Sequence, residues 1–182
     1  MTSKKVFGGL RESIPVVCVS GNHDVGDAPT PSALKKYRER YGDDYFMFYV
    51  NGVRFIVCNT SLYNDPSNAE EEYKTQEKWL EEVLSTRHDP IIILGHHPWF
   101  LYQEDEEDDL PGFSYFRGEE CPDSYFHVET ARRKPVLKLF EDGGVKAMFA
   151  GHWHQNKCSK TNAGTEMVIT SALGGQLGTD LP

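Results

Sequence analysis

Two histidines, His152 and His154, stand two positions apart after Gly151, in a stretch that follows the apolar run Val145–Phe149. The run predicts a buried strand, and in an extended backbone side chains two positions apart lie on the same face. Both imidazoles can therefore point at one ion, because neutral imidazole is a common ligand for zinc and related metals. Two partly buried histidines satisfied by hydrogen bonds would show the same spacing. The presence of further candidate ligands elsewhere in the chain would favour the metal site over the hydrogen-bonded histidines.

Two further turns have the same form, a glycine followed by polar side chains at the end of an apolar run. They are Gly21–Asp24, after Val16–Val19, and Gly95–Pro98, after Ile91–Leu94. In an α/β sheet such turns line the rim where sites are built, and a glycine lets the backbone approach an ion closely. Asparagine oxygen and imidazole nitrogen suit zinc, iron(II) or manganese better than calcium. The three turns therefore predict a metal site.

The intervening sequence predicts the strands and helices that carry these turns. Continuous apolar, β-branched runs are typical of strands covered on both faces, and Asn51-Gly52 is a strong hairpin signal. Helices are indicated by apolar spacing, by Thr30-Pro31 as a start and by glycines as stops. The expected elements are a strand at 16–19, a helix at 30–42, a hairpin of 45–50 and 53–58, a helix within 68–87, a strand at 91–94, a helix from Lys134 to Gly143, and strands at 145–149 and 167–170.

Composition restricts the class of protein. A chain of 182 residues suits one domain, and its net charge of −9 is a poor match for nucleic acid or an anionic membrane surface. The four cysteines are far apart, which favours reduced thiols, and no signal peptide or membrane-spanning run is present in the sequence. We expect a cytoplasmic monomer with no nucleic-acid partner and no membrane partner.

Two other conspicuous segments predict no site. The six carboxylates of Glu104–Asp109 repel one another, so they are expected to form a solvated loop. The glycine-rich Gly174–Gly178 lacks a lysine and a strand-loop-helix context, which excludes a phosphate-binding loop.

The three turns, in this order, resemble the calcineurin-like metallophosphoesterase superfamily, with its GNH[DE], histidine-before-H-x-P and GHxH motifs. The resemblance runs from Pro15 to Gly178. Segments such as Gly42–Phe46 and Tyr63–Ser67 narrow it to the calcineurin-like phosphoesterase domain-containing protein 1 group, which implies cytosolic serine/threonine phosphatases. It implies an α/β fold, an αββα sandwich of two mixed sheets flanked by helices, truncated at both ends. Residues 1–14 are then a leader outside the family, and 15–182 a partial phosphoesterase domain.

The resemblance also implies a ligand set. Asn22, His96 and His152 would bind one metal ion, and His154 would bind the other. The intact family uses two divalent ions, from among zinc, iron and manganese, to hydrolyse a phosphomonoester on a phosphoserine or phosphothreonine protein substrate.

Three more residues receive roles. By the resemblance, His23 is the catalytic proton donor to the leaving alkoxide. Asp24 is expected either to orient a neighbour or to cap its turn. His97 is expected behind the ligands or facing substrate, because adjacent side chains in extended backbone diverge and the residue before Pro98 is held extended.

The family's first two motifs, D-x-H and GD, do not precede Asn22. The pairs Gly26-Asp27 and Gly42-Asp43 match the GD motif in residue type, but both come after the first turn. Without a bridging carboxylate to offset the repulsion of two cations, we expect at most one ion in this chain. The leading hypothesis is a weakly active or inactive form of a serine/threonine phosphatase, and the alternative is a non-catalytic or unstable fragment that binds partners. A phosphodiesterase is disfavoured by the acidic composition.

Overall fold

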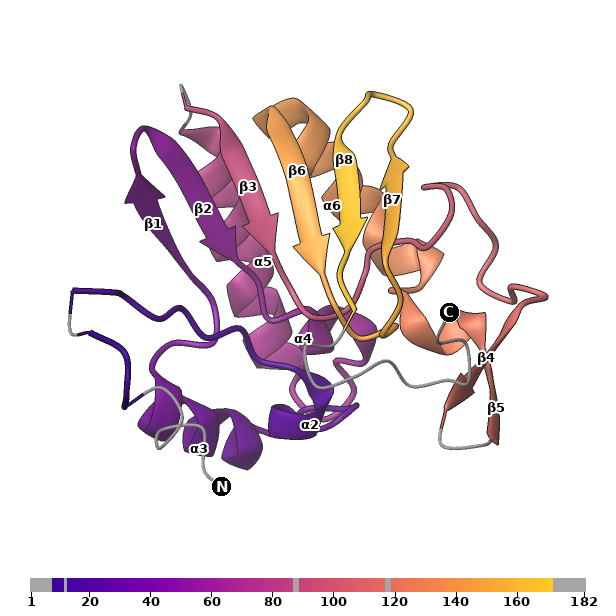
Figure 1. Cartoon of the computed structure of the whole chain (residues 1–182), viewed down its shortest axis with the longest axis horizontal. Helices are drawn as coiled ribbons and strands as arrows, with labels where there is room; N and C mark the ends of the chain where they lie inside the picture. The colour runs from indigo at the N-terminus through magenta and orange to yellow at the C-terminus, as the bar shows by residue number, and fades with distance from the viewer. Residues whose placement is uncertain (1–7, 12, 87–88, 117–118, 172–182) are drawn as a thin grey trace.

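A mixed six-stranded sheet forms the centre of the computed structural model, which describes residues 8–11, 13–86, 89–116 and 119–171 (Figure 1). The strands, in their order across the sheet, are β1 (Phe46–Val50), β2 (Val53–Val57), β3 (Ile91–Leu94), β6 (Val145–Ala150), β8 (Glu166–Ile169) and β7 (Lys157–Lys160). The four inner strands are parallel, and the two edge strands are antiparallel to their neighbours. Parallel neighbours bring their carboxyl ends to one edge, where polar turns can meet.

Two long helices, α5 (Glu70–Ser85) and α6 (Thr130–Gly143), cover one face of the sheet (Figure 1). The main core lies between them and the sheet and includes Leu80, Ile93 and Phe140. The shorter elements are α2 (Asn22–Val25), α3 (Pro31–Tyr41), α4 (Thr60–Asn64), the 3₁₀ helix η1 (Asp123–Phe126) and a separate hairpin of β4 (Phe113–Phe116) and β5 (Glu119–Pro122). No helix in the described part of the chain combines the length and apolarity that crossing a membrane requires.

Several expected elements are confirmed. Thr30 Oγ1 accepts from the backbone N–H of Ala33 at 3.2 Å and begins α3, as its residue type predicts. Asn51 and Gly52 have φ of 49° and 80°, which is the backbone that a two-residue hairpin needs. The α/β class with a mixed sheet flanked by helices is also confirmed. Of the two sheets expected, the described residues form the six-stranded sheet and the small β4–β5 hairpin.

The expected strand at 16–19 is not formed, because no described residue pairs with it. Val16 and Val17 are 46% and 41% exposed instead of buried. The expectation that β6 is covered on both faces is also wrong for the described residues, since its Phe149 is 37% exposed. An apolar run indicates a strand only if a neighbouring strand supplies its hydrogen bonds.

Helix α6 begins four residues before the expected Lys134, at Thr130. Asp108 caps it from a distance: its Oδ1 accepts from the backbone N–H and the hydroxyl of Thr130, both at 2.7 Å. A carboxylate at a helix N-terminus satisfies free N–H groups and favours the helix dipole. Pro135 therefore lies inside the helix and not at its start.

The acidic segment Glu104–Asp109 is only partly the solvated loop that was expected. Glu106 is 4% exposed, and its carboxylate accepts from three successive backbone N–H groups, those of Leu101, Tyr102 and Gln103, at 2.8, 2.8 and 3.1 Å. A carboxylate held by backbone N–H groups and near a buried arginine tolerates burial. This segment therefore anchors the loop that leads away from β3.

The glycine-rich segment 174–178 lies outside the described residues.

Candidate active site

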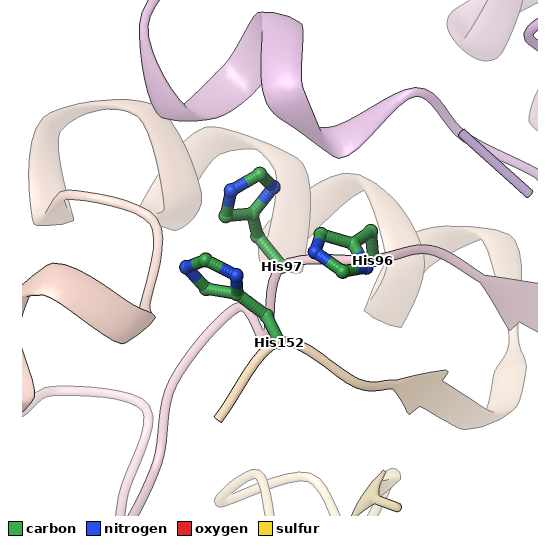
Figure 2. A group of neighbouring side chains, drawn as sticks. All are labelled: His96, His97 and His152. Atoms are coloured by element: carbon green, nitrogen blue, oxygen red, sulfur yellow. The ribbon is translucent and has the colours of Figure 1, made fainter. Parts of the chain in front are cut away.

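The turns after β3 and β6 lie side by side at the carboxyl edge of the sheet, and Figure 2 shows the three imidazoles that they bring together. Because β3 and β6 are parallel neighbours, Gly151 N–H donates to the carbonyl of His96 at 3.0 Å. The ring centroids of His97 and His152 are 4.3 Å apart, and those of His96 and His152 are 4.9 Å apart. Sheet topology therefore produces the convergence that the two motifs predict.

One ring nitrogen from each of His96, His97 and His152 lies within 4.8 Å of the others, and no carboxylate belongs to this group among the described residues. Nε2 of His97 and Nε2 of His152 are buried without a hydrogen-bond partner. Buried polar atoms are normally satisfied, so two unpartnered nitrogens in this group of imidazoles are suited to bind a cation. Three imidazoles suit zinc and related divalent ions, and the donor set fits a metal of that class.

Asn22 brings an oxygen to the same place from the first turn. Its Oδ1 lies 2.9 Å from Nε2 of His96, and its Nδ2 donates to Oδ1 of Asp27 at 2.8 Å. The close approach requires the glycine before it, because a Cβ on Gly21 would lie 2.9 Å from the His96 ring. The motif of the first turn therefore reaches the site as expected, although the residues before it form no strand.

The GHxH turn is not extended, which corrects the expected geometry. His152 and His154 have φ of 62° and 56°, in the left-handed region that residues with a Cβ rarely adopt. Such residues cost about 1–3 kcal/mol each and concentrate at functional sites. Trp153 packs inward and is 6% exposed. His154 lies outside the three-imidazole group, and its Nδ1 is buried without a partner.

The two remaining candidates of the first turn differ in exposure and contacts. His23 is exposed, and it lies near enough to His96 and His154 to contribute to the lowered pKa of each. Asp24 Oδ2 accepts from the backbone N–H of Gly21 at 3.1 Å, which is the turn-capping contact. The catalytic role of His23 and any effect of Asp24 on the ligands stay predictions.

His97 is more central than the sequence suggests. Its side chain is fully buried, its ring stands at 89° to that of His96, and both rings belong to the same group. Thr60 Oγ1 accepts from the backbone N–H groups of His96 and His97 at 2.9 and 2.7 Å and bends this turn. The adjacent side chains therefore do not diverge as an extended backbone would require, and neither His96 nor His97 is excluded as a ligand.

Burial keeps the imidazoles neutral. It lowers the pKa of His152 to about 3, with a further contribution from His96, and lowers the pKa of His96 to about 4. Burial also holds the pKa of His97 well below its usual range. Neutral imidazoles keep a lone pair for a metal, so at neutral pH these side chains need not lose a proton before they bind one.

These shifts predict acid destabilisation of the metal-free chain. The unfolded histidines take up protons as the pH falls below about 6.5, whereas the folded ones resist until about pH 4 or lower, so the free energy of unfolding decreases over that interval. Urea unfolding between pH 7 and pH 5, where carboxylates titrate little, measures this. A His152→Asn variant should show a shallower decline, and a midpoint that rises toward pH 5 would contradict the assignment.

Two residues at the site carry no motif signal. The hydroxyl of Tyr125, in η1, donates to Asp27 Oδ1 at 3.0 Å and lies 3.5 Å from Asn22 Nδ2. Burial, with a contribution from Asp27, raises the pKa of Tyr125 to about 12, so the hydroxyl keeps its proton at neutral pH. The Gly26-Asp27 pair matches the family's GD motif in the sequence, but its position after the first turn does not predict this contact.

Comparison with known proteins agrees with the site. The family model described as Calcineurin-like phosphoesterase matches residues 2–156. Serine/threonine-protein phosphatase CPPED1 of Pongo abelii is 39% identical over 181 residues, and that of Homo sapiens is 38% identical over 181 residues. Each alignment covers 97% of this chain and 53% of the relative, so the chain spans about half the length of these curated relatives.

A solved structure agrees at the level of the fold. A dimetal phosphatase from Danio rerio superposes with a TM-score of 0.56 at 13% identity, over 87% of this chain and 62% of the other. The resemblance drawn from the three turns is therefore confirmed. This chain belongs to the calcineurin-like phosphoesterase family.

Proposed function

We propose that this chain takes part in metal-dependent hydrolysis of phosphate monoesters on phosphoserine or phosphothreonine of protein substrates. The observation that carries the proposal is the convergence of His96, His97 and His152, with two unpartnered nitrogens, at the carboxyl edge of the sheet. Membership in the phosphoesterase family and the names of the two CPPED1 relatives support the reaction class.

The position of each residue determines its proposed role. Asn22, His96 and His152 hold a divalent ion, and His154 extends the ligand set on the open side. When bound, such an ion neutralises charge on the phosphoryl group and makes water a better nucleophile. His23, exposed beside these ligands, gives its proton to the departing serine or threonine oxygen, which makes that oxygen a better leaving group.

The ligand set limits how many ions the described residues hold. Asparagine and neutral histidines offer no charge to offset the repulsion between two cations a few ångströms apart. We therefore propose one ion, zinc, iron or manganese, and weak turnover. The other candidate, a binding protein without activity, has no observation of its own in its favour.

The setting of this activity is also a proposal. The four cysteines are free, which supports a reducing compartment such as the cytoplasm, and the net charge of −9 supports a soluble monomer without a nucleic-acid partner.

The test is manganese-dependent turnover of a phosphoserine peptide and of p-nitrophenyl phosphate by the chain and by His23→Ala. We expect EDTA to abolish activity and the variant to lose about 10²- to 10⁴-fold on the peptide, with unchanged metal content. The loss on p-nitrophenyl phosphate should be smaller, because its leaving group needs no proton.

Three results would contradict this account. Loss of the metal from His23→Ala would make His23 a ligand, and faster cleavage of bis-p-nitrophenyl phosphate than of the monoester would indicate a phosphodiesterase. Complete absence of turnover in a chain that binds metal would favour the non-catalytic alternative.

A further inference from the structure

The short helix η1, which no sequence motif marks, contacts two of the three ligand-bearing turns. Its Tyr125 lies beside Asn22 of the first turn and beside His152 of the last. The two ligands come from distant parts of the chain, so a metal ion that uses both depends on their relative placement. Tyr125 contacts both side chains from outside the three motifs.

The side-chain amide of Asn22 is fixed at both ends. Its Nδ2 donates to Asp27 at 2.8 Å, and its Oδ1 lies 2.9 Å from Nε2 of His96. An ionised carboxylate accepts hydrogen bonds and donates none, so the NH₂ group must face Asp27 and the oxygen must face His96. Asp27 therefore determines which atom of Asn22 is offered to a metal.

Tyr125 holds Asp27 and His152 at the same time. Its hydroxyl donates to Asp27 Oδ1 at 3.0 Å, on the side of the carboxylate that also receives Asn22. Its ring centroid lies 5.2 Å from that of His152, with 45° between the two ring planes. Nε2 of His152 is left without a partner. A residue packed against a ligand histidine helps to fix the orientation of its ring.

The helix that carries Tyr125 is itself tied to the last turn. Asp123 Oδ1 accepts from Ser114 Oγ at 2.7 Å, and Ser114 Oγ accepts from the indole N–H of Trp153 at 2.8 Å. Tyr102 donates to the other oxygen of Asp123 at 2.7 Å. Trp153 lies between the two histidines of its turn. These hydrogen bonds therefore fix the position of η1 relative to that turn. Tyr125 is therefore positioned by this hydrogen-bond network as well as by its own contacts.

We propose that Tyr125 and Asp27 are positioning residues that hold Asn22 and His152 so that both offer a ligand atom to one divalent ion. The inference rests on the proposed metal-dependent function and adds the residues that orient its ligands. Partners of metal ligands typically change metal affinity by about 10- to 100-fold when they are removed.

The test is a cobalt(II) titration, followed by absorbance, of Tyr125→Phe, Asp27→Ala and the control Tyr49→Phe. Tyr125→Phe removes only the hydroxyl and keeps the packing against His152. Tyr49 is 55% exposed on β1, so its variant makes the same chemical change away from the site. We expect at least about 10-fold weaker cobalt(II) binding in the first two variants and less than twofold change in the control. Parent-like affinity in Tyr125→Phe and Asp27→Ala would overturn the inference.

A metal-free readout separates this inference from the proposed function. The side-chain amide resonances of Asn22 in NMR spectra should shift in Tyr125→Phe and Asp27→Ala and stay in place in Tyr49→Phe. If the parent chain bound no cobalt(II), the metal-dependent function would fail, while these resonances would still decide whether Asn22 is held as proposed. Unchanged Asn22 resonances in both site variants would overturn the positioning role whatever the metal result.

Discussion

The His152→Ala variant is expected to lose zinc or cobalt affinity by more than about 100-fold, beyond the usual effect of removing a partner of a ligand. His152 is the central member of the imidazole group, because its ring centroid lies 4.9 Å from the ring centroid of His96 and 4.3 Å from that of His97. Removing it also takes away one of the two unpartnered Nε2 atoms in the group. Isothermal titration measures the change.

His127 provides a matched control for this variant. It is also buried, at 2% exposed, and its Nε2 also lacks a partner, but it lies outside the imidazole group. His127→Ala should bind metal as the parent does, with folding of both variants checked by circular dichroism. Equal losses in the two variants would show that metal binding follows general damage to the core and not the placement of His152.

Arg133→Met is expected to destabilise the fold by about 3–5 kcal/mol, the range for removing one partner from a buried charged network. Arg133 is fully buried in α6. Its guanidinium donates to the carbonyls of Glu104 at 3.1 Å and Val128 at 3.0 Å, to the carbonyl of Glu106, and to the Asp108 carboxylate at 3.3 Å. Methionine fills similar space but leaves these acceptors unsatisfied.

The midpoint of urea unfolding gives the size of this effect. Arg40→Met is the control, because Arg40 is exposed and a surface substitution usually changes stability by less than about 0.5 kcal/mol. A loss below 1 kcal/mol in Arg133→Met would mean that the acidic segment does not depend on this arginine. The same experiment therefore tests whether Glu104–Asp109 is an anchored structure or the solvated loop that its composition suggests.

Elements whose cause is local could be predicted from the sequence. Asn51-Gly52 determines its hairpin by backbone preference, and Thr30 begins α3 through its own side chain. The start of α6 could not be predicted, because its cap is Asp108, 22 residues away. The apolar run at 16–19 failed for a related reason, since an apolar segment does not encode which strand, if any, pairs with it.

The same distinction applies to the site. The meeting of His96 with His152 follows from two polar turns at the ends of parallel strands, and that rule is visible in the sequence. The left-handed backbone of the last turn is not visible, because both of its unusual residues are histidines and not glycine. Tyr125 stands 98 residues from Asp27, so only the folded chain shows that the two residues meet.

The number of zinc ions bound by the purified chain, measured by native mass spectrometry, tests the central claim most directly. The claim is that three turns, from α2, β3 and β6, form one metal centre with neutral ligands. We predict one zinc ion per parent chain and none in a His96→Ala, His152→Ala double variant. Two tightly held ions per chain, or one ion that persists in the double variant, would contradict the account and show that other residues supply the ligands.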